Sequence, residues 1–275
     1  MKCHIVDVFA ETRFAGNQLA VVLDCEHLSS DAMQDIAREM NFSETTFVIH
    51  QSEDEARVRI FTPERELSFA GHPTIGTAWV LGRDMGVYTL DLDAGRVPVS
   101  FAEDGVAWMV PPQVDLGEPI VPALAARLVG LSEADIHPDF PCRYAVVGPR
   151  FALIGLTSLD VLKRAAVNVT THAEMAGGDF FAVFVFTPET HEFNAQFAAR
   201  MFFSAQGFRE DPATGSANTA FAAHLRSLGR TGSFTVEQGF EIKRPSHLYL
   251  DVGDVIRVGG RVQPVLEGEM LFDSE

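Results

Sequence analysis

The sequence contains few cysteines and lacks the cysteine and histidine groupings that bind zinc. Its three cysteines, Cys3, Cys25 and Cys142, lie far apart, and neither a CxxC pair nor an HExxH stretch occurs among the 275 residues. An odd number of widely spaced cysteines is typical of reduced, buried thiols. We therefore expect a protein with no metal site, whose three cysteines are reduced and buried in the hydrophobic core.

Long apolar runs are also absent. No stretch approaches the ~18 uncharged apolar residues that a membrane-spanning helix requires. Near the N-terminus, Asp7 and Glu11 occupy positions where a signal peptide has apolar residues. Low-complexity segments are missing too. The hydrophobic content of 47% is ordinary for a globular protein and is enough to form a packed core. We expect a chain that folds throughout, has no membrane partner and resides in the cytoplasm.

Positive charge is scarce. Only three of the 21 basic residues, Lys2, Lys163 and Lys243, are lysines, and the formal net charge is −17 at pH 7. An acidic surface repels the phosphate backbone of nucleic acids, so a nucleic-acid partner is disfavoured. Nucleotide binding has no support, because GxxxxGK[ST] does not occur and no GxGxxG follows a strand pattern. Without a GxSxG turn, a serine hydrolase has little support either.

What the sequence does contain is a succession of short strand and helix patterns, with an interruption near the middle. Pro111-Pro112 is closely followed by Gly117-Glu118-Pro119, and such residues are typical of a connection between domains. We place an N-terminal half at residues 1–116 and a C-terminal half at residues 117–266. A last strand at 267–275 is expected to return to the N-terminal half.

Two stretches about half the chain apart share one pattern. Residues 71–78 read Gly-His-Pro-Thr-Ile-Gly-Thr-Ala, and residues 210–217 read Glu-Asp-Pro-Ala-Thr-Gly-Ser-Ala. In each, a polar residue precedes a proline, and a Gly-Thr/Ser-Ala run opens a helix pattern. His72 and Asp211 are 211 − 72 = 139 residues apart, far longer than the ~20–50-residue period of a solenoid. The repeat predicts two homologous halves whose helix starts face one central cleft.

A helix start of this kind suits an anionic ligand. Its free N–H groups and partial positive charge attract a carboxylate or a developing enolate-like charge, and glycine lets the ligand approach the backbone. His72 and Asp211 are candidates to orient or protonate a substrate there. Each motif taken alone is also a good structural cap, and Asp211 is a natural N-cap. The occurrence of both motifs in matching positions favours a functional role.

Ser43-Glu44 supplies a candidate acid. The pair follows a helix pattern that ends at Asn41 and precedes a segment rich in β-branched residues. Loops and element ends commonly present catalytic groups, and a carboxylate in a poorly solvated cleft has a raised pKa, which suits a proton carrier. The alternative interpretation, that Ser43 or Glu44 caps a helix terminus, carries equal weight on the residues alone.

Five stretches together identify a family resemblance. They are Phe14-Ala15-Gly16-Asn17, Ser43-Glu44-Thr45-Thr46-Phe47, Phe61-Thr62-Pro63-Glu64, Phe69-Ala70-Gly71-His72-Pro73-Thr74 and Glu210-Asp211-Pro212-Ala213-Thr214-Gly215-Ser216-Ala217. In this order they resemble the phenazine-biosynthesis PhzF-like isomerases. The resemblance implies a diaminopimelate-epimerase-like α+β fold. In that fold, two pseudo-symmetric halves each form a curled, mostly antiparallel sheet around a central helix. It also implies a homodimer that needs no cofactor.

The resemblance also assigns roles to residues. It implies that Glu44 is the proton-shuttling acid/base, with Ser43 beside it, in an active site between the halves. His72 and Asp211 match the polar residues at the paired helix starts. The positions that hold the substrate carboxylate are matched by glycine and serine residues, namely Gly71, Gly215 and Ser216.

Two departures bear on the chemistry. Gln18 occupies a position where the family's early motif often has proline, which affects the shape of the local loop. The related epimerases use a cysteine at each helix start, whereas this chain has His72 and Asp211 there, so two-thiol racemisation is disfavoured.

Three functions remain for the cleft. The first is an isomerase in which Glu44 moves a proton between two carbons of a small carboxylate-bearing substrate. The second is an amino-acid racemase or epimerase that uses His72 and Asp211 as opposed acid/base groups. The third is a non-catalytic binding protein, which the presence of Glu44, His72 and Asp211 disfavours, because binding alone has less need of a proton carrier.

Overall fold

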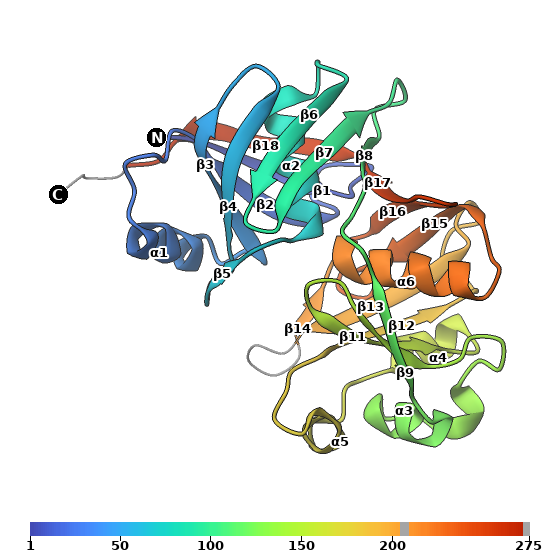
Figure 1. Ribbon diagram of the computed structural model, residues 1–275. Coiled ribbons are helices and arrows are strands. Elements are labelled where there is room, and N and C mark those ends of the chain that lie inside the picture. Colours follow the sequence, from blue (N-terminus) through green and yellow to red (C-terminus); the bar gives the residue numbers. More distant parts are fainter. Residues whose placement is uncertain (204–208, 272–275) are drawn as a thin grey trace. The chain divides into compact units, whose positions relative to one another are not determined.

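The computed structural model describes residues 1–203 and 209–271, and its chain divides into two compact units (Figure 1). Met1–Pro111 and Arg257–Glu275 form the first unit, and Pro112–Ile256 form the second. The predicted boundaries, after residues 116 and 266, both lie later in the chain than these. The strand expected at 267–275 lies partly outside the described residues. None of the described helices is long and apolar enough to cross a membrane.

The first unit is a curled sheet with one helix inside it. Its strands are β1 (Lys2–Val8), β2 (Asn17–Val22), β3 (Glu44–Gln51), β4 (Glu55–Phe61), β5 (Glu66–Leu67), β6 (Val87–Leu92), β7 (Gly95–Phe101), β8 (Ala107–Met109), β17 (Ile256–Gly260) and β18 (Val262–Glu269). Its helices are α1 (Ser30–Met40) and α2 (Gly71–Gly82). Across the sheet the strands run β18, β1, β2, β3, β4, β6, β7, β8 and β17, with β5 also beside β4.

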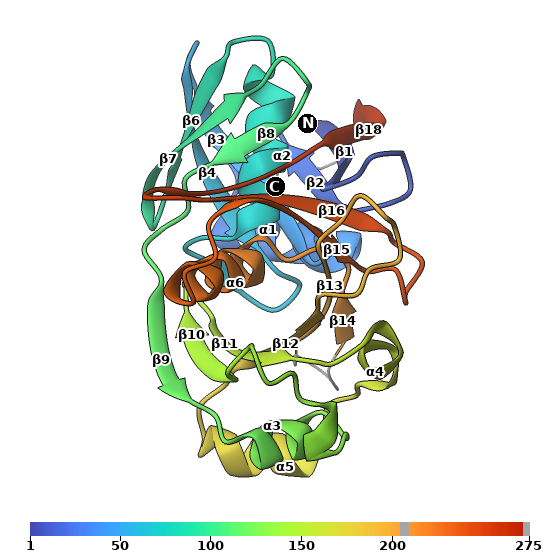
Figure 2. The ribbon, with the colours of Figure 1, turned by 90° about the vertical axis from the view of Figure 1, so that its right-hand side faces the viewer.

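Most neighbouring strands of this unit are antiparallel, and only the pairs β2–β3 and β4–β6 are parallel among those described. The two strands at the ends of this order, β17 and β18, are consecutive in the chain, so the sheet curls almost into a closed ring. Helix α2 contacts strands on every side of the curl, and Figure 2 shows it enclosed by them. Residues 71–78 are therefore buried on all faces of the helix.

Close packing of α2 against the sheet depends on Gly76. A Cβ atom at this position would lie 2.5 Å from Leu19 Cδ2 and 2.7 Å from Val8 Cγ2. Real Cβ atoms do not approach other atoms so closely, so any larger residue would push α2 away from β1 and β2. Gly76 thereby fixes the distance between the central helix and the strands that lead to the candidate site.

The second unit has its own strands and helices. The strands are β9 (Asp115–Pro119), β10 (Arg143–Val146), β11 (Arg150–Gly155), β12 (Ala182–Thr187), β13 (Phe197–Phe203), β14 (Arg209–Asp211), β15 (Gly232–Gln238) and β16 (Ser246–Val252). The helices are α3 (Pro122–Leu128), α4 (Leu159–Arg164), α5 (Val169–Ala176) and α6 (Gly215–Ser227), with a 3-10 turn at Glu133–Asp135.

The second unit repeats the strand pairing of the first. Its order is β9, β10, β11, β12, β13, β15 and β16, with β14 also beside β13. The pairs β11–β12 and β13–β15 are parallel and the others are antiparallel, as in the first unit starting from β18. Helix α6 takes the place of α2 and is buried from Gly215 to Leu225. The predicted α+β fold of two pseudo-symmetric halves, each with a central helix, is confirmed.

Candidate active site

Glu44 is the first residue of β3, and the preceding helix determines where it stands. Helix α1 ends at Met40, and Asn41 adopts the left-handed conformation with its N–H bonded to Ala37 O. The chain then turns into β3, where Glu44 pairs with Leu19 of the parallel neighbour β2. The Glu44 side chain is 17% exposed. The side chain is therefore mostly buried but keeps some contact with solvent, which suits a group that exchanges protons with a ligand.

His72 lies against Glu44, although 28 positions separate them in the chain. It is the second residue of α2, and its Nδ1 is 3.4 Å from Glu44 Oε2. The imidazole is 4% exposed, and this burial lowers its pKa to about 3, while a hydrogen bond with the backbone of Gln18 opposes the shift. At neutral pH the carboxylate of Glu44 therefore faces a neutral imidazole and not a positive charge.

The loop between β1 and β2 brings Gln18 next to His72. Its turn needs glycine at position 16, where φ is +66° and a Cβ would lie 2.4 Å from Val8 O. The Asp7 carboxylate accepts the backbone N–H of Phe14 at 2.6 Å and holds the loop. The chain turns at residues 13–14. Gln18, which stands where the family often has proline, forms its hydrogen bond with His72 through its backbone and not through its side chain.

The helix starts differ from the predicted alignment in one respect. Helix α2 begins at Gly71 after the N-cap Ala70, and α6 begins at Gly215 after the N-cap Thr214. Gly71 thus matches Gly215, and His72 matches Ser216. Asp211 belongs to the end of β14, so the expectation that it stands at a helix start or acts as N-cap is wrong. The two prolines of the shared pattern occupy different places, because Pro73 lies within α2 whereas Pro212 precedes α6.

Asp211 is nevertheless tied to the start of α6. Its Oδ2 accepts a hydrogen bond from Thr214 Oγ1 at 2.5 Å. Gly215 and Ser216 occupy the first turn of α6 and are buried. Neither Ala70 nor Thr214 makes a side-chain cap hydrogen bond to its helix. Both central helices therefore begin without the side-chain acceptor that usually occupies their first N–H groups.

Gln238 is a residue that the sequence analysis missed. Its Nε2 donates to Asp211 O at 2.9 Å and to Thr214 Oγ1 at 3.0 Å. Its Oε1 accepts from Thr214 N at 3.2 Å and from Asn218 Nδ2 at 3.0 Å. Every donor and acceptor of this buried amide is used, so it fixes the segment between β14 and α6. No local motif marks it, because its partners lie 20 to 27 positions earlier.

The predicted site residues thus fall into two groups. In the first unit, Glu44, His72 and Gly71 come together, with Ser43 exposed beside Glu44 in the chain. In the second unit, a group forms around the start of α6 and comprises Asp211, Gly215 and Ser216 together with Thr214 and Gln238.

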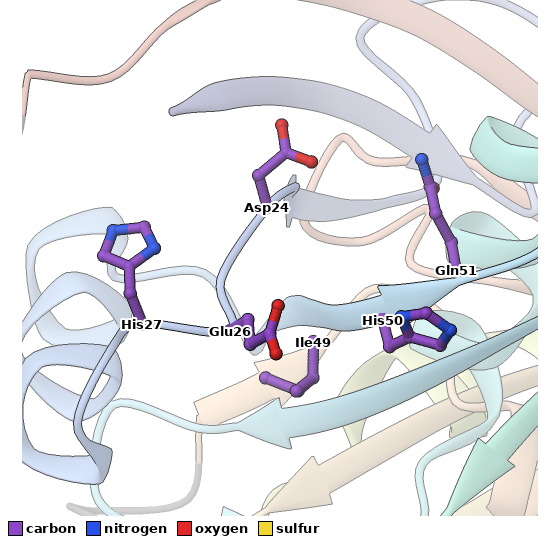
Figure 3. A pocket seen from close by; sticks show the side chains of 6 residues that line it. All are labelled: Asp24, Glu26, His27, Ile49, His50 and Gln51. Atoms are coloured by element: carbon purple, nitrogen blue, oxygen red, sulfur yellow. The ribbon is translucent and has the colours of Figure 1, made fainter.

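A polar depression of about 430 Å³ lies elsewhere in the first unit (Figure 3). It is lined by Asp24, Glu26, His27, Ile49, His50 and Gln51. Its polar lining side chains are solvent-exposed. Ile49 is five residues along β3 from Glu44, which at ~3.3 Å per residue is about 17 Å. The depression therefore takes no part in the candidate site.

Comparison with known proteins gives a consistent result. The family model of the phenazine biosynthesis-like proteins, PhzC-PhzF, matches residues 6–268. An uncharacterised isomerase of Pasteurella multocida is 38% identical over 286 residues, covering 98% of this chain and 94% of the relative. The trans-2,3-dihydro-3-hydroxyanthranilate isomerase of Pseudomonas aeruginosa is 37% identical over 255 residues, covering 89% of this chain and 88% of that enzyme.

Solved structures agree in fold. A phenazine biosynthesis protein of the PhzF family from Bacillus anthracis has a TM-score of 0.84 and 25% identity, with 99% of both chains covered. A hydroxyproline epimerase from Agrobacterium vitis shares the fold at 12% identity, with a TM-score of 0.61 over 98% of this chain and 91% of that one. By its motifs, its paired strand order and these similarities, the chain belongs to the phenazine biosynthesis-like (PhzC-PhzF) family and is an isomerase.

Proposed function

We propose that this isomerase moves a proton between two carbons of a small carboxylate-bearing substrate, with Glu44 as the acid/base. The observation that carries the proposal is the contact at the start of α2, where Glu44 Oε2 is 3.4 Å from Nδ1 of the buried, neutral His72. A cation at that distance would lower the basicity of Glu44, whereas a neutral imidazole orients the carboxylate and leaves it able to accept a proton.

The proton balance of the reaction is simple. Glu44 takes a proton from one carbon, and the electron pair of that C–H bond becomes delocalised over the adjacent unsaturated system. The same carboxyl group returns the proton to a second carbon, and the double bonds shift. No electron is gained or lost overall, so the scheme needs no cofactor. The charge that develops between the two steps is of the kind that free helix N–H groups stabilise.

We further propose that the second unit helps to bind the same substrate. Gly215 and Ser216 stand at the uncapped start of α6, where backbone N–H groups suit a carboxylate. Asp211 is held by Thr214 and Gln238, so it has a fixed orientation from which to accept a hydrogen bond from a substrate amine or hydroxyl group.

The substrate proposed for the first test is trans-2,3-dihydro-3-hydroxyanthranilate, the compound named for the Pseudomonas relatives. The purified protein is incubated with it in deuterated water, and product and carbon-bound deuterium are followed. A shifted double-bond system, with deuterium at the newly protonated carbon to the extent that the Glu44 proton exchanges, supports the proposal.

The same preparation separates the alternative functions when it is incubated with a panel of amino acids. Exchange of an α-proton together with inversion of that centre would replace the isomerase proposal by a racemase or epimerase. Thermal stabilisation by carboxylates without turnover or exchange of any of them would instead indicate a binding protein.

A further inference from the structure

Two buried threonines join the strand that carries Glu44 to the helix that carries His72. Thr46 of β3 and Thr77 of α2 are both 0% exposed, and their Oγ1 atoms are 2.8 Å apart, within hydrogen-bond distance. Thr46 Oγ1 also donates to Ala20 O of β2 at 3.4 Å, so Thr77 is the donor to Thr46. The two bonds form a chain from α2 through β3 to β2. Neither threonine is among the predicted site residues.

The two side-chain contacts between β3 and α2 lie at matching distances along both elements. Thr46 is two residues after Glu44, which at ~3.3 Å per residue is about 7 Å along the strand. Thr77 is five residues after His72, which at ~1.5 Å per residue is about 7.5 Å along the helix. The Glu44–His72 and Thr46–Thr77 contacts therefore join one strand to one helix at two points. The second contact prevents the strand from pivoting about the first.

The residue before Thr77 fixes the helix against the neighbouring strand. Gly76 lets α2 lie close to Leu19 of β2, and Leu19 stands opposite Glu44 in the parallel pair β2–β3. Consecutive residues of the helix thus contact consecutive strands of the sheet, one by close packing and the other by a hydrogen bond. Apolar packing sets a distance, whereas a hydrogen bond is also directional. The threonine pair therefore fixes how far α2 is turned and shifted against β3.

The second unit makes the matching contact in a different way. Thr77 is the seventh residue of α2 and matches Phe221, the seventh residue of α6, while β12 takes the place of β3 in the strand order. The ring centroid of Phe221 is 5.8 Å from that of Phe184 and 4.3 Å from that of Phe186, both on β12. Strand β12 contains no ionisable residue. The unit whose strand carries Glu44 thus has a directional contact where the other unit has an apolar one.

Burial of threonine in α2 does not require a bond to β3. Thr74, also 0% exposed, donates through Oγ1 to Ala70 O of its own helix at 2.7 Å, which is a common way to satisfy such a hydroxyl. Two valines at positions 46 and 77 would fill a similar volume and would bury no polar atom at all. The bond between Thr46 and Thr77 therefore contributes alignment of the strand with the helix.

We propose that Thr46 and Thr77 are positioning residues of the isomerase, which hold the Glu44 carboxylate at Nδ1 of His72. This inference rests on the proposed role of Glu44 as the acid/base. Both threonine side chains are fully buried, so they act through Glu44 and His72 and do not touch the substrate. Misplacement of a catalytic group by about 1 Å can cost about 100-fold in rate. A smaller shift of β3 against α2 therefore lowers kcat more than it changes KM.

The test begins with valine and serine replacements of Thr46. Thr46→Val keeps the shape of the side chain, removes its hydroxyl and leaves Thr77 without a partner, so both the melting temperature and kcat are expected to fall. The expected loss of kcat is about tenfold, with KM changed less than about threefold. Thr46→Ser keeps the hydroxyl and is expected to retain most of kcat, which a role in filling space alone would not produce.

The double variant Thr46→Val/Thr77→Val separates positioning from stability. With both hydroxyls removed, neither threonine site holds an unpaired polar group, so the melting temperature is expected to return close to that of the wild type. The value of kcat is expected to stay about tenfold low, because the directional contact is missing. Recovery of kcat together with the melting temperature would overturn the proposal.

A measurement without substrate gives a second readout. The pH titration of the Glu44 carboxyl carbon, followed by carbon-13 NMR, is expected to have a different midpoint in the double valine variant, because the carboxylate has moved relative to His72. Identical titrations of Glu44 in the wild type and in the double variant would overturn the proposal, since they would show that Glu44 keeps its surroundings without the two hydroxyls.

The matched control is Thr171→Val, at a buried threonine of α5, a helix that contributes no residue to either group of site residues. It is expected to keep the kcat of the wild type, and an equal loss of kcat in this variant and in the double variant would overturn the proposal. Glu44→Gln separates this inference from the proposed function. Full turnover by Glu44→Gln would remove both, whereas an inactive Glu44→Gln beside a fully active double variant would remove only the role of the threonines.

Discussion

At the residue scale, the contact between Glu44 and His72 sets the chemistry that the first unit can perform. Burial of His72 lowers its pKa to about 3, so the imidazole is neutral at neutral and mildly acidic pH. Its role is therefore to orient Glu44 and not to titrate. Acid loss of activity is expected to report the protonation of a carboxylate.

Replacement of His72 by asparagine tests this role. The amide can still form hydrogen bonds but does not fill the imidazole site, so Glu44 loses its fixed orientation. We expect kcat to fall about 10- to 100-fold with a smaller change in KM. We also expect the acidic limb of the pH–rate profile to keep its midpoint. Steady-state kinetics at several pH values provide the measurement, and loss of the acidic limb in the variant would show that His72 itself titrates.

The sequence carried limited information at this scale. Glu44 and His72 were each identified as site residues by motif and family resemblance, but their contact depends on how β3 and α2 pack in the curl. No spacing rule links residues 28 positions apart. Asp211 was placed at a helix start because both repeats contain proline, whereas the helix actually begins four residues later, at Gly215.

At the element scale, the start of α6 is held by Gln238 through four hydrogen bonds. Of the two Gly-Thr/Ser-Ala runs expected to open a helix, the run at Gly215 does open α6, whereas the run at Gly76 lies inside α2, which begins at Gly71. The sequence could not predict Gln238, whose partners are brought to the end of β15 by the tertiary structure. A buried polar network of this kind cannot be predicted from sequence, because its members become neighbours only after the strands have paired.

Gln238→Ala is expected to destabilise the protein by about 2–4 kcal/mol, because it leaves several buried groups of the Asp211–Asn218 segment unpaired. Activity should fall as well, since Asp211 and Thr214 lose their support. Urea unfolding gives the free energy of unfolding, and kinetics give kcat. Gln196→Ala is the matched control, because Gln196 is exposed and lies in the same unit. Equal stability of the two variants would contradict the role assigned to Gln238.

At the scale of the whole molecule, the two units share one strand order. In the sequence, their similarity was recognisable only in the two stretches 71–78 and 210–217. Pairings such as β2–β3 and β11–β12 join strands separated by helices, and no local pattern specifies them. The arrangement of the strands into two curled sheets was therefore predicted from the family resemblance and not from local residue patterns. The second boundary lies earlier than residue 266 because β17 already pairs with β8 of the first unit.

Stability of the whole molecule is expected to fall in acid. His224 of α6 is buried, neither ring nitrogen has a hydrogen-bond partner, and burial lowers its pKa from 6.5 to about 4. Below pH 6.5 the unfolded chain takes up a proton that the folded chain does not, so stability declines as pH falls from 6.5 to 4. For this one group the loss is roughly 3 kcal/mol, and His72 acts in the same direction.

His224→Leu removes this contribution, so its unfolding free energy should depend less steeply on pH between 6.5 and 4 than that of the wild type. The measurement is urea unfolding at several pH values within that window. Parallel curves for the two proteins would show that His224 does not bind its proton preferentially in the unfolded state.

The central claim is that Glu44 carries the proton, and Glu44→Gln tests it most directly. The amide keeps the size and the hydrogen bonding of the side chain but can neither accept nor deliver the proton. On a substrate that the wild type isomerises, we expect kcat of this variant to fall at least about 100-fold, with an unchanged melting temperature. Wild-type turnover by a well-folded Glu44→Gln variant would contradict the account.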